Sequence, residues 1–388
     1  MAKLGDFMRI KHGFAFKGDY ITAEDNEIVL VTPGNFEIGG GFKEKKCKFF
    51  SGDYPKDYVL HADDLIVTMT DLSKQGDTLG YSARVPNSNR IYLHNQRIGL
   101  VDVFNPNADK DYLYWFMRTP QYQKKIVATA SGSTVKHTSP SRICDVEINL
   151  PSIDKQKKIA SLLTSIEKKI HISERINDNL EQQAAALFSN LYNRSNTEVR
   201  YTDLIQILGG GTPKTGETAY WNGNIAFFTP KDVGTPYTFI TEKTITEEGL
   251  SHCNSRLYPV NTVFVTARGT VGKVGLSGVP MAMNQSCYAL VGKETHQLLV
   301  YFYTLKAVDR LKHKASGAVF DAITTRDFNS EQIMKLSDDD AKAFLCVAEP
   351  MFQEILNNSI ENLRLSTLRD FLLPKLMSGE IDVSSVQL

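Results

Sequence analysis

The chain has 388 residues, enough for two or three domains, and its 42% hydrophobic and 10% aromatic content is typical of a folded protein. Its 44 basic and 44 acidic residues give a formal net charge of zero, which excludes a protein that binds nucleic acid through a large overall positive charge. Five cysteines without a CxxC pair, and no leader or apolar run of membrane-spanning length, predict reduced thiols, no metal site and a cytoplasmic location.

The first 150 residues predict a β-rich domain that becomes helical near its end. Short β-branched or aromatic runs, typical of strands, occur at Ile28–Thr32, Leu65–Met69 and Ile91–Leu93, and clusters of Gly, Asn, Asp and Ser separate them. A helical pattern follows at Asp111–Ala128. We therefore expect residues 1–150 to form an α+β domain with a mixed sheet, ending at the turn before Ser152.

The stretch from Ser152 to Asn193 contains no Gly or Pro and predicts one long helix. Steps of three and four residues from Leu163 to Leu191 give a mostly apolar seam at heptad spacing, which is the pattern of a coiled coil. About 40 helical residues span about 60 Å, so a second helix has to lie along the first. We predict that residues 151–195 form a central spacer helix whose seam contains Leu163, Ile166, Ile170, Asn177, Leu180 and Leu187.

Residues 196–337 repeat the order of segments in the first domain, so we expect a second domain of the same α+β fold. A strand is predicted at Val263–Thr266 and a helix at His296–Ala315. The repeated pairs are VLVTPGNF at Val29–Phe36 with AFFTPKDV at Ala226–Val233, DDLIVTMT at Asp63–Thr70 with NTVFVTAR at Asn261–Arg268, HNQRIGL at His94–Leu100 with MNQSCYAL at Met283–Leu290, and ASGST at Ala130–Thr134 with ASGAV at Ala315–Val319.

Residues 338–388 supply the second spacer helix and a tail. Adding 185 to the first seam gives a second, mostly apolar seam that contains Met351, Ile355, Asn362, Leu365 and Leu372. Asn362 is the counterpart of Asn177, and a buried Asn in such a seam costs stability while it fixes register and partner. Because Pro350 and Pro374 interrupt this copy, we expect Pro350 to open the long helix, with Ser337 and Asp338 to Asp340 capping a short helix before it. The alternative is that the two long helices pack on separate globular cores.

Catalytic motifs are incomplete in this sequence. GTVGKV at Gly269–Val274 has Ala267 where a P-loop has its first Gly, and Val274 where it has a hydroxyl residue. Asn105–Ala108 (NPNA) lacks the second Pro and the aromatic residue of the adenine-methyltransferase tetrad, and the eight histidines form no HExxH zinc motif. A nuclease site made of scattered carboxylates and lysines stays open as an alternative.

A recognition protein remains the best interpretation of the doubled pattern. Two similar domains held apart by paired helices would read two separate patches of a long, regular ligand, and duplex DNA fits that description best. Antiparallel helices would relate the domains by a pseudo-two-fold axis and match half-sites about 34 Å apart. Residues 338–388 carry 4 basic and 9 acidic side chains, so the rest of the chain is mildly basic and has room for a local basic groove.

Several motifs resemble the specificity subunit of type I restriction-modification systems, and together they cover essentially the whole chain. They are GGGTPKTGETAYWNGNIAFFTPKDV at Gly209–Val233, TMTDLSKQGDTLGY at Thr68–Tyr81, ARGTVGKVG at Ala267–Gly275, NLPSIDKQKKIASLLTSIEKKI at Asn149–Ile170, NDNLEQQAAALF at Asn177–Phe188 and LRDFLLPKLMSGEI at Leu368–Ile381. The resemblance implies a non-catalytic subunit with two target-recognition domains, each of which reads one half of a bipartite target in double-stranded DNA.

The resemblance also implies protein partners. Two modification (methyltransferase) subunits would dock on the helices, and restriction (translocase/nuclease) subunits would join them, with the methyl donor, ATP and magnesium on these partners and no cofactor on this chain. One departure concerns the start of the second helix, where Leu336, Ser337 and Asp338 replace the cluster of Leu150, Pro151 and Gln156. This departure suggests that the two helices contact the modification subunits unequally.

Polar and basic residues in turns are the candidates for DNA contact, because loops reach the grooves while strands and helices form the scaffold. Arg, Asn and Gln can read base edges, whereas Lys more often holds phosphate. In the first domain the candidates are Ser73, Lys74, Gln75, Asn95, Gln96, Arg97, Lys136, His137 and Arg142. In the second domain they are Lys214, Thr215, Arg268, Thr270, Lys273, Asn284, Gln285, Lys312, Lys314 and Arg326.

Each candidate also has a structural interpretation. The Asn-Gln pair that recurs in both halves is as well suited to shaping a sheet turn as to contacting a base, and Gly209–Gly211 with Thr212 and Pro213 are typical of turn geometry. The lysines at 43, 45, 46 and 48 are expected to be solvated, and Trp115 and Trp221 are expected to anchor the core. At the level of the whole protein, the alternatives are a self-sufficient methyltransferase or nuclease, and a coiled-coil scaffold that binds proteins alone.

Overall fold

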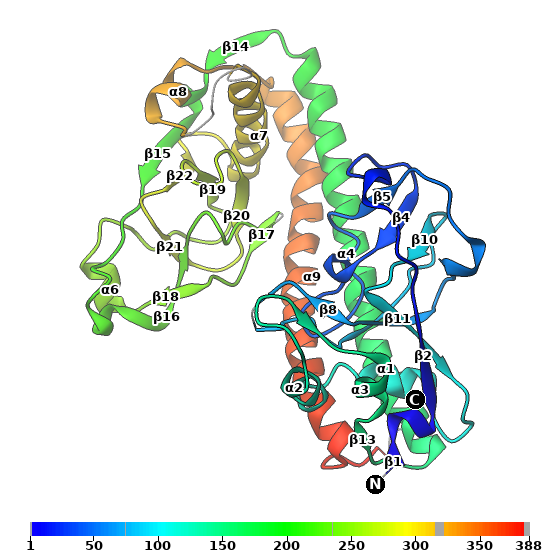
Figure 1. The fold of residues 1–388 in the computed structure, drawn as a ribbon. Coiled ribbons are helices and arrows are strands. Elements are labelled where there is room, and N and C mark those ends of the chain that lie inside the picture. Colours follow the sequence, from blue (N-terminus) through cyan, green and yellow to red (C-terminus); the bar gives the residue numbers. More distant parts are fainter. Residues whose placement is uncertain (1, 74, 235, 315–321, 384–388) are drawn as a thin grey trace. The chain divides into compact units, whose positions relative to one another are not determined.

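The computed structural model describes residues 2–73, 75–234, 236–314 and 322–383 (Figure 1). Contacts divide the chain into two units, Met1–Ile170 with Arg364–Leu388 (unit 1) and His171–Leu363 (unit 2). Each unit therefore contains one strand-rich domain together with a part of each long helix. The domain boundaries expected at 150, 195 and 337 fall close to the ends of the long helices, and they stay predictions.

Unit 1 contains two larger sheets and two strand pairs. Its strands are β1 (Ala2–Lys3), β2 (Met8–His12), β3 (Ile21–Thr22), β4 (Ile28–Val31), β5 (Lys48–Phe50), β6 (Val59–Leu60), β7 (Leu65–Thr68), β8 (Thr70–Asp71), β9 (Ser82–Arg84), β10 (Ile91–His94), β11 (Ile98–Val103), β12 (Lys136–His137) and β13 (Glu147–Ile148). The sheet orders are β3-β5-β4-β10-β6 and β2-β11-β7-β9, and β1 pairs with β13 and β8 with β12. Strands β4 and β10 run parallel while their other neighbours run antiparallel, so the expected mixed sheet is present.

Unit 2 repeats the central strands of this arrangement, with one sheet larger and the other smaller than in unit 1. Its strands are β14 (Thr197–Arg200), β15 (Ile205–Gly209), β16 (Trp221–Phe228), β17 (Tyr237–Thr238), β18 (Lys243–Ile245), β19 (Val263–Thr266), β20 (Val274–Ser277), β21 (Met281–Met283), β22 (Cys287–Gly292) and β23 (Gln332–Lys335). The sheet orders are β15-β22-β19-β20-β17 and β18-β16-β21, and β14 pairs with β23. Strands β16 and β21 are parallel in the same way as β4 and β10, and the order β15-β22-β19-β20 corresponds to β2-β11-β7-β9. The central strands of the two domains are therefore arranged alike, as the repeated sequence segments predict.

The described residues form shorter helices at the two stretches predicted to be helical, Asp111–Ala128 and His296–Ala315, and four others that were not predicted. In unit 1 they are α1 (Lys110–Phe116), α2 (Pro120–Ala128) and α3 (Pro140–Cys144), and in unit 2 they are α5 (Tyr201–Leu204), α6 (Glu247–Ser251), α7 (Gln297–Lys314) and α8 (Thr325–Ser330). The single helix expected at Asp111–Ala128 is two helices, because Thr119 caps a new helix that has Pro120 in its first turn. Single 3-10 turns occur at Leu4–Asp6, Gly18–Tyr20, Pro33–Asn35, Lys56–Tyr58 and Thr218–Tyr220.

The two long helices are α4 (Ile153–Arg194) and α9 (Asp338–Ser378). Helix α9 passes through Pro350 and Pro374 without a break, so the prediction that Pro350 opens the helix was wrong. Phe344, Ala348 and Phe352 are buried on one face on both sides of Pro350, and this packing outweighs the backbone hydrogen bond that proline removes. The Ser337 hydroxyl accepts a hydrogen bond from the Asp340 amide (3.1 Å), so the expected cap begins the long helix itself.

In each unit, α4 and α9 run antiparallel and share one core with the domain. In unit 1, Leu163 of α4 and Leu376 of α9 pack in one cluster with the fully buried Trp115 of α1. In unit 2, the Phe188 ring of α4 contacts Phe302 of α7 and Phe344 of α9 at centroid distances of 5.0 and 5.4 Å. The alternative in which each helix packs on a separate core is therefore wrong, and Figure 1 shows α4 (green) beside α9 (orange to red).

The predicted seam positions are buried or half-buried throughout. On α4 they are Leu163, Ile166, Ile170, Asn177, Leu180 and Leu187, and on α9 they are Met351, Ile355, Asn362, Leu365 and Leu372. These positions therefore lie on the packed side of each long helix, and their role as a coiled-coil seam stays a prediction. Within the part of the chain that the structure describes, every helix is too short or too polar to cross a membrane.

Candidate nucleic-acid interface

The turn Asn95–Arg97 between β10 and β11 presents two of the candidate side chains. The Asn95 side-chain oxygen accepts a hydrogen bond from the Arg97 amide (3.0 Å), and the Asn95 carbonyl accepts one from the Ile98 amide (2.9 Å). His94 bridges the base of the turn, since its Nε2 lies 2.8 Å from the Ile98 carbonyl oxygen and donates to it. Asn95 is buried, whereas Gln96 and Arg97 are exposed. The Asn therefore shapes the turn and its two neighbours face solvent.

Met69 and the β8–β12 strand pair lie next to this turn. The Arg97 carbonyl accepts a hydrogen bond from the Met69 amide (2.9 Å), and the Met69 carbonyl accepts one from the Thr138 amide (3.0 Å). Met69 therefore joins the Asn95–Arg97 turn to the β8–β12 pair, in which His137 lies opposite Thr70. The Thr70 hydroxyl is 3.2 Å from Nδ1 of the exposed His137 ring.

Arg142 of α3 belongs to the same cluster. Backbone hydrogen bonds of 3.0 and 2.8 Å join Ser131 to His137, and Arg142 Nη1 donates to the Ser131 hydroxyl (3.2 Å). The guanidinium is exposed. Hydrogen bonds thus connect the backbone segments that carry Arg97, His137 and Arg142. The first and last of these residues are 45 positions apart in the sequence.

Asp71 anchors the loop that carries the remaining candidates of unit 1. Its carboxylate accepts hydrogen bonds from the Ser73 amide and the Thr78 hydroxyl, both at 2.6 Å. Burial works to raise the pKa of Asp71, but the hydrogen bonds from Thr78 and Ser73 prevail and hold that pKa below its usual value. Gln75 is exposed on this loop, Lys136 lies opposite Asp71 in the strand pair, and Lys74 lies outside the described residues.

Unit 2 builds its turn with the same hydrogen bonds. The Asn284 side-chain oxygen accepts from the Ser286 amide (3.0 Å), as Asn95 does from Arg97. The Ser286 carbonyl accepts from the Ala267 amide (2.8 Å), and the Ala267 carbonyl accepts from the Ile323 amide (2.9 Å), so Ala267 has the joining role of Met69. We call the turn Asn95–Arg97 with Met69, and its counterpart Asn284–Ser286 with Ala267, the backbone frame of each unit. The two frames share individual hydrogen bonds.

Exposed polar and cationic side chains cover the frame of unit 2. Arg268, Thr270 and Lys273 lie in the turn between β19 and β20, and the Thr266 hydroxyl accepts a hydrogen bond from the Lys273 amide (2.9 Å). A Cβ atom added at Gly272 would lie 2.6 Å from Cε of Lys312, so the Lys312 stem lies directly over this turn. The Gln285 side-chain oxygen accepts a hydrogen bond from the Thr212 hydroxyl.

The remaining candidates of unit 2 lie in other loops or helices, and one of them forms an ion pair. Lys214 and Thr215 are exposed in the loop before β16, and Arg326 is exposed on α8. Lys314 pairs with the buried Glu331 carboxylate at 2.5 Å, and Arg310 contacts its other oxygen at 2.8 Å. The ammonium of Lys314 therefore holds the end of α7 against the start of β23. ASGAV at Ala315–Val319 lies outside the described residues.

The structural interpretations can be compared with the burial of each residue. Trp115 is fully buried and Trp221 is half-buried, so Trp115 is a core anchor. Of the lysine cluster, Lys45, Lys46 and Lys48 are exposed, while Lys43 lies 3.7 Å from the Glu37 carboxylate. Among the described residues, no three His, Cys, Asp or Glu side chains lie close enough to hold a metal ion, and the five cysteines are free thiols.

The family profile described as "Type I restriction modification DNA specificity domain" matches residues 1–182 and again residues 193–335. The chain belongs to this family. The resemblance inferred from the motifs is thereby confirmed. Each match covers one strand-rich domain of this type I specificity subunit, and the first also covers much of α4.

Relatives of the chain are specificity subunits by name. The HindI specificity subunit of Haemophilus influenzae is 24% identical over 85% of this chain and 93% of the relative, and the EcoBI specificity subunit of Escherichia coli is 30% identical over 40% and 30%. A crystal structure of a type I restriction-modification S subunit from M. genitalium matches with a TM-score of 0.62 and 16% identity, covering 96% of this chain and 94% of that one. That match shows a shared fold of two domains and long helices.

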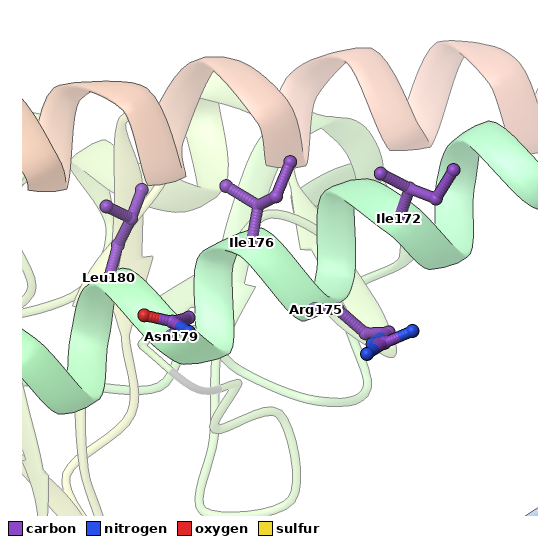
Figure 2. Close-up of a pocket in the computed structure, with 5 residues that line it drawn as sticks. All are labelled: Ile172, Arg175, Ile176, Asn179 and Leu180. Atoms are coloured by element: carbon purple, nitrogen blue, oxygen red, sulfur yellow. The ribbon is translucent and has the colours of Figure 1, made fainter.

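The specificity subunit also has a groove on a long helix. In unit 2, Ile172, Arg175, Ile176, Asn179 and Leu180 of α4 line a shallow groove of 340 Å³. Figure 2 shows Ile172, Ile176 and Leu180 in a row on one side of α4, with Arg175 and Asn179 below them. Ile172 is 57% exposed and Ile176 is 44% exposed, and neither is a seam position. Leu180 of this row is a predicted seam residue, whereas Ile172 and Ile176 were missed because only seam positions were considered.

Proposed function

We propose that this chain is the DNA-binding subunit that gives a type I restriction-modification complex its sequence specificity. Residues 1–150 would read one half of a bipartite target in double-stranded DNA, and residues 196–337 would read the other. The observation that carries the proposal is the repeated backbone frame, which presents Gln96 and Arg97 in unit 1 and Gln285 and Arg268 in unit 2.

These side chains have the chemistry for reading bases. The guanidinium of Arg can form two hydrogen bonds with guanine, and the amide of Gln can form two with adenine. A frame fixed by hydrogen bonds keeps the backbone of the turn in place before DNA arrives, so little backbone entropy is lost on binding. Nearby lysines, such as Lys136 and Lys273, would contact phosphates and make affinity depend on salt.

The spacing between the half-sites would come from the helices. Helices α4 and α9 continue without a break through residues that belong to both units. We infer that they act as a spacer, since two paired helices resist bending more than a flexible linker does. Lengthening α4 by one turn, with a matching change in α9, should lengthen the non-specific gap in the target.

The complex would contain further subunits. Two modification subunits would bring the methyl donor and transfer the methyl group, and restriction subunits would bring ATP and magnesium for translocation and cleavage. In this proposal the specificity subunit positions these partners in the cytoplasm, holds no cofactor and makes or breaks no bond itself. The relatives named above, which are called specificity subunits, support this division of labour.

Exposed apolar pairs on the helices support a docking role. Ile172 and Ile176 are exposed on α4, and Leu368 and Phe371 are exposed on α9 (45% and 57%). Apolar side chains on an otherwise polar helix are typical of surfaces that another protein covers. We propose that each pair packs against a modification subunit, and because the pairs differ, the two subunits would be held unequally.

Methyl transfer tests the division of labour directly. Purified chain and DNA would be mixed with isotope-labelled methyl donor, with and without modification subunits. The proposal predicts label on DNA only when the modification subunits are present. Label transfer by the chain alone would favour a self-sufficient methyltransferase. A complete assembly without salt-dependent DNA binding would favour a protein scaffold.

A further inference from the structure

Phe14 is an exposed aromatic side chain beside the candidate DNA-reading turn of unit 1. Its side chain is 40% exposed, and its ring contacts Phe16 and Tyr58 at centroid distances of 5.2 and 5.3 Å. The rings of Phe16 and Tyr58 pack against the Phe14 ring and limit the orientations that it can adopt. Part of the Phe14 ring is therefore packed against other rings, and the rest is open to solvent.

The backbone of Phe14 is bonded to the turn itself. The Phe14 amide donates a hydrogen bond to the His94 carbonyl (2.8 Å), and the Phe14 carbonyl accepts one from the Gln96 amide (2.9 Å). Gly13 makes this close approach possible, because a Cβ atom there would lie 2.2 Å from the Asn95 carbonyl oxygen. Phe14 thus lies opposite Asn95 in a parallel bridge, with its two backbone hydrogen bonds reaching the residues on either side of Asn95.

Unit 2 has the same close approach without the aromatic ring. A Cβ atom on Gly210 would lie 2.3 Å from the Asn284 carbonyl oxygen, and the next amide, that of Gly211, donates to the Met283 carbonyl (3.1 Å). Gly211 is therefore the counterpart of Phe14. The side chain that follows, Thr212, donates a hydrogen bond to Gln285, so this part of unit 2 is polar.

Two cationic residues, Lys11 and Arg97, belong to the two segments that meet beside Phe14. Lys11 Nζ is 4.8 Å from the centroid of the Tyr58 ring, which also contacts Phe14, and the exposed Arg97 follows Gln96 in the turn. Cations beside an exposed aromatic ring match a ligand that has a phosphate backbone and apolar groups on its bases. The C5 methyl of thymine, in the major groove, is such an apolar group, and Phe is among the side chains that contact it.

We propose that Phe14 recognises a thymine in the half-site read by residues 1–150, through contact between its ring and the thymine C5 methyl. This inference rests on the proposed function of the chain as a DNA-specificity subunit. Insertion of the ring between base pairs is less favoured, because Phe16 and Tyr58 cover part of it. No equivalent methyl contact is expected at Gly211 in the other half-site.

The test uses the complex with its modification subunits and a target mapped from methylated DNA. Deoxyuridine, which lacks only the C5 methyl, would replace each thymine of the first half-site in turn. For the native complex, one such replacement should weaken binding about fourfold, the factor expected for one buried methyl-sized group. For Phe14→Ala, the same replacement should have no effect, although that variant binds the thymine-containing target more weakly than the native complex.

Phe104→Ala is the matched control, because Phe104 is an exposed aromatic residue (54%) just beyond the opposite end of β11 from the turn. It should keep the native response to deoxyuridine. Phe14→Leu, which keeps an apolar side chain, should retain part of that response and shows that the site still folds. The inference fails if no thymine in the half-site responds, if Phe14→Ala responds like the native complex, or if Phe14→Ala loses the modification subunits instead. A failure of the proposed function would appear earlier, as a complex without any mapped bipartite target.

Discussion

Arg118 and Glu167 form a buried ion pair in which Nη1 of Arg118 lies 2.5 Å from the Glu167 carboxylate. The side chains are 4% and 15% exposed, and Arg118 also donates a hydrogen bond to the Gly39 carbonyl (2.9 Å). Burial works to lower the pKa of Arg118, but its interactions with the Tyr114 hydroxyl and the Glu167 carboxylate prevail and raise it. One guanidinium therefore connects a loop of the first domain and α1 to the helix α4.

Replacing Glu167 by Gln should destabilise unit 1, because the buried guanidinium would lose its counter-charge. We expect a loss of about 3 kcal/mol in the free energy of unfolding, measured by urea denaturation of the full chain. Glu174→Gln is the control, since Glu174 lies on the same helix with a side chain that is 57% exposed, and it should change stability little. Equal effects of the two substitutions would contradict this role of the ion pair.

The seam of unit 2 contains a polar layer around Asn177. Its side-chain oxygen accepts a hydrogen bond from Asn358 Nδ2 (3.0 Å), and its own Nδ2 donates to the Ser359 hydroxyl (3.3 Å). Its partner is therefore not Asn362, its counterpart in the repeat, whose buried side-chain oxygen has no hydrogen-bond partner. Because α4 and α9 are antiparallel, moving four residues forward from Asn358 on α9 corresponds to moving four residues back from Asn177 on α4. Asn362 is therefore at the level of Ser173.

Asn177→Leu should cost about 1 to 3 kcal/mol, because the Asn358 amide would lose its partner. The double substitution Asn177→Leu with Asn358→Leu should recover that stability, as apolar seam residues pack without unpaired polar groups. A double-mutant cycle measured by urea unfolding gives the coupling between the two positions. Strictly additive effects would show that the pair does not define the register.

His94 should make the stability of unit 1 depend on pH. Burial lowers the pKa of His94 below its usual value of 6.5, although its hydrogen bond with Ile98 works in the opposite direction. The unfolded chain therefore binds a proton before the folded chain does. The contribution of His94 to stability is complete above about pH 6.5 and is lost as the pH falls from 6.5 toward the lowered pKa.

The substitution His94→Met tests this dependence, since Met283 occupies the same place in unit 2. Urea midpoints of the full chain between pH 5 and pH 8 should fall less steeply on acidification for His94→Met than for the native chain. His61→Asn removes an exposed histidine of the same unit and should leave the native slope unchanged. If the urea midpoint of His94→Met falls with pH as steeply as that of the native chain, His94 is not the source of the pH dependence.

The apolar row on α4 predicts where a modification subunit binds. Ile172→Lys combined with Ile176→Lys should weaken binding of the modification subunit by about tenfold or more, because two exposed isoleucines would no longer be buried. Gln182→Lys combined with Ala186→Lys is the control, with two exposed positions at the same spacing on the same helix. Titration of labelled modification subunit measures both, and unchanged affinity in the isoleucine variant would place the docking surface elsewhere.

The parts of the fold that repeat could be predicted from the sequence. The heptad spacing predicted which residues form the seams, because only one face of each long helix is buried. Paired segments such as HNQRIGL and MNQSCYAL predicted the turns that have the same hydrogen bonds in both units. The continuity of α9 through Pro350 could not be predicted, because packing of Phe344 and Phe352 decides it. Phe14 was missed because its nearness to Gln96 depends on a contact between segments 82 residues apart.

The central claim is that each domain reads one half of the DNA target. The most direct measurement is to exchange residues 1–150 for those of a relative with a different target, express the hybrid with its partner subunits, and sequence the methylated bases in cells. The account predicts that one half-site changes while the other half-site and the gap stay the same. A change in both half-sites, or in neither, would contradict it.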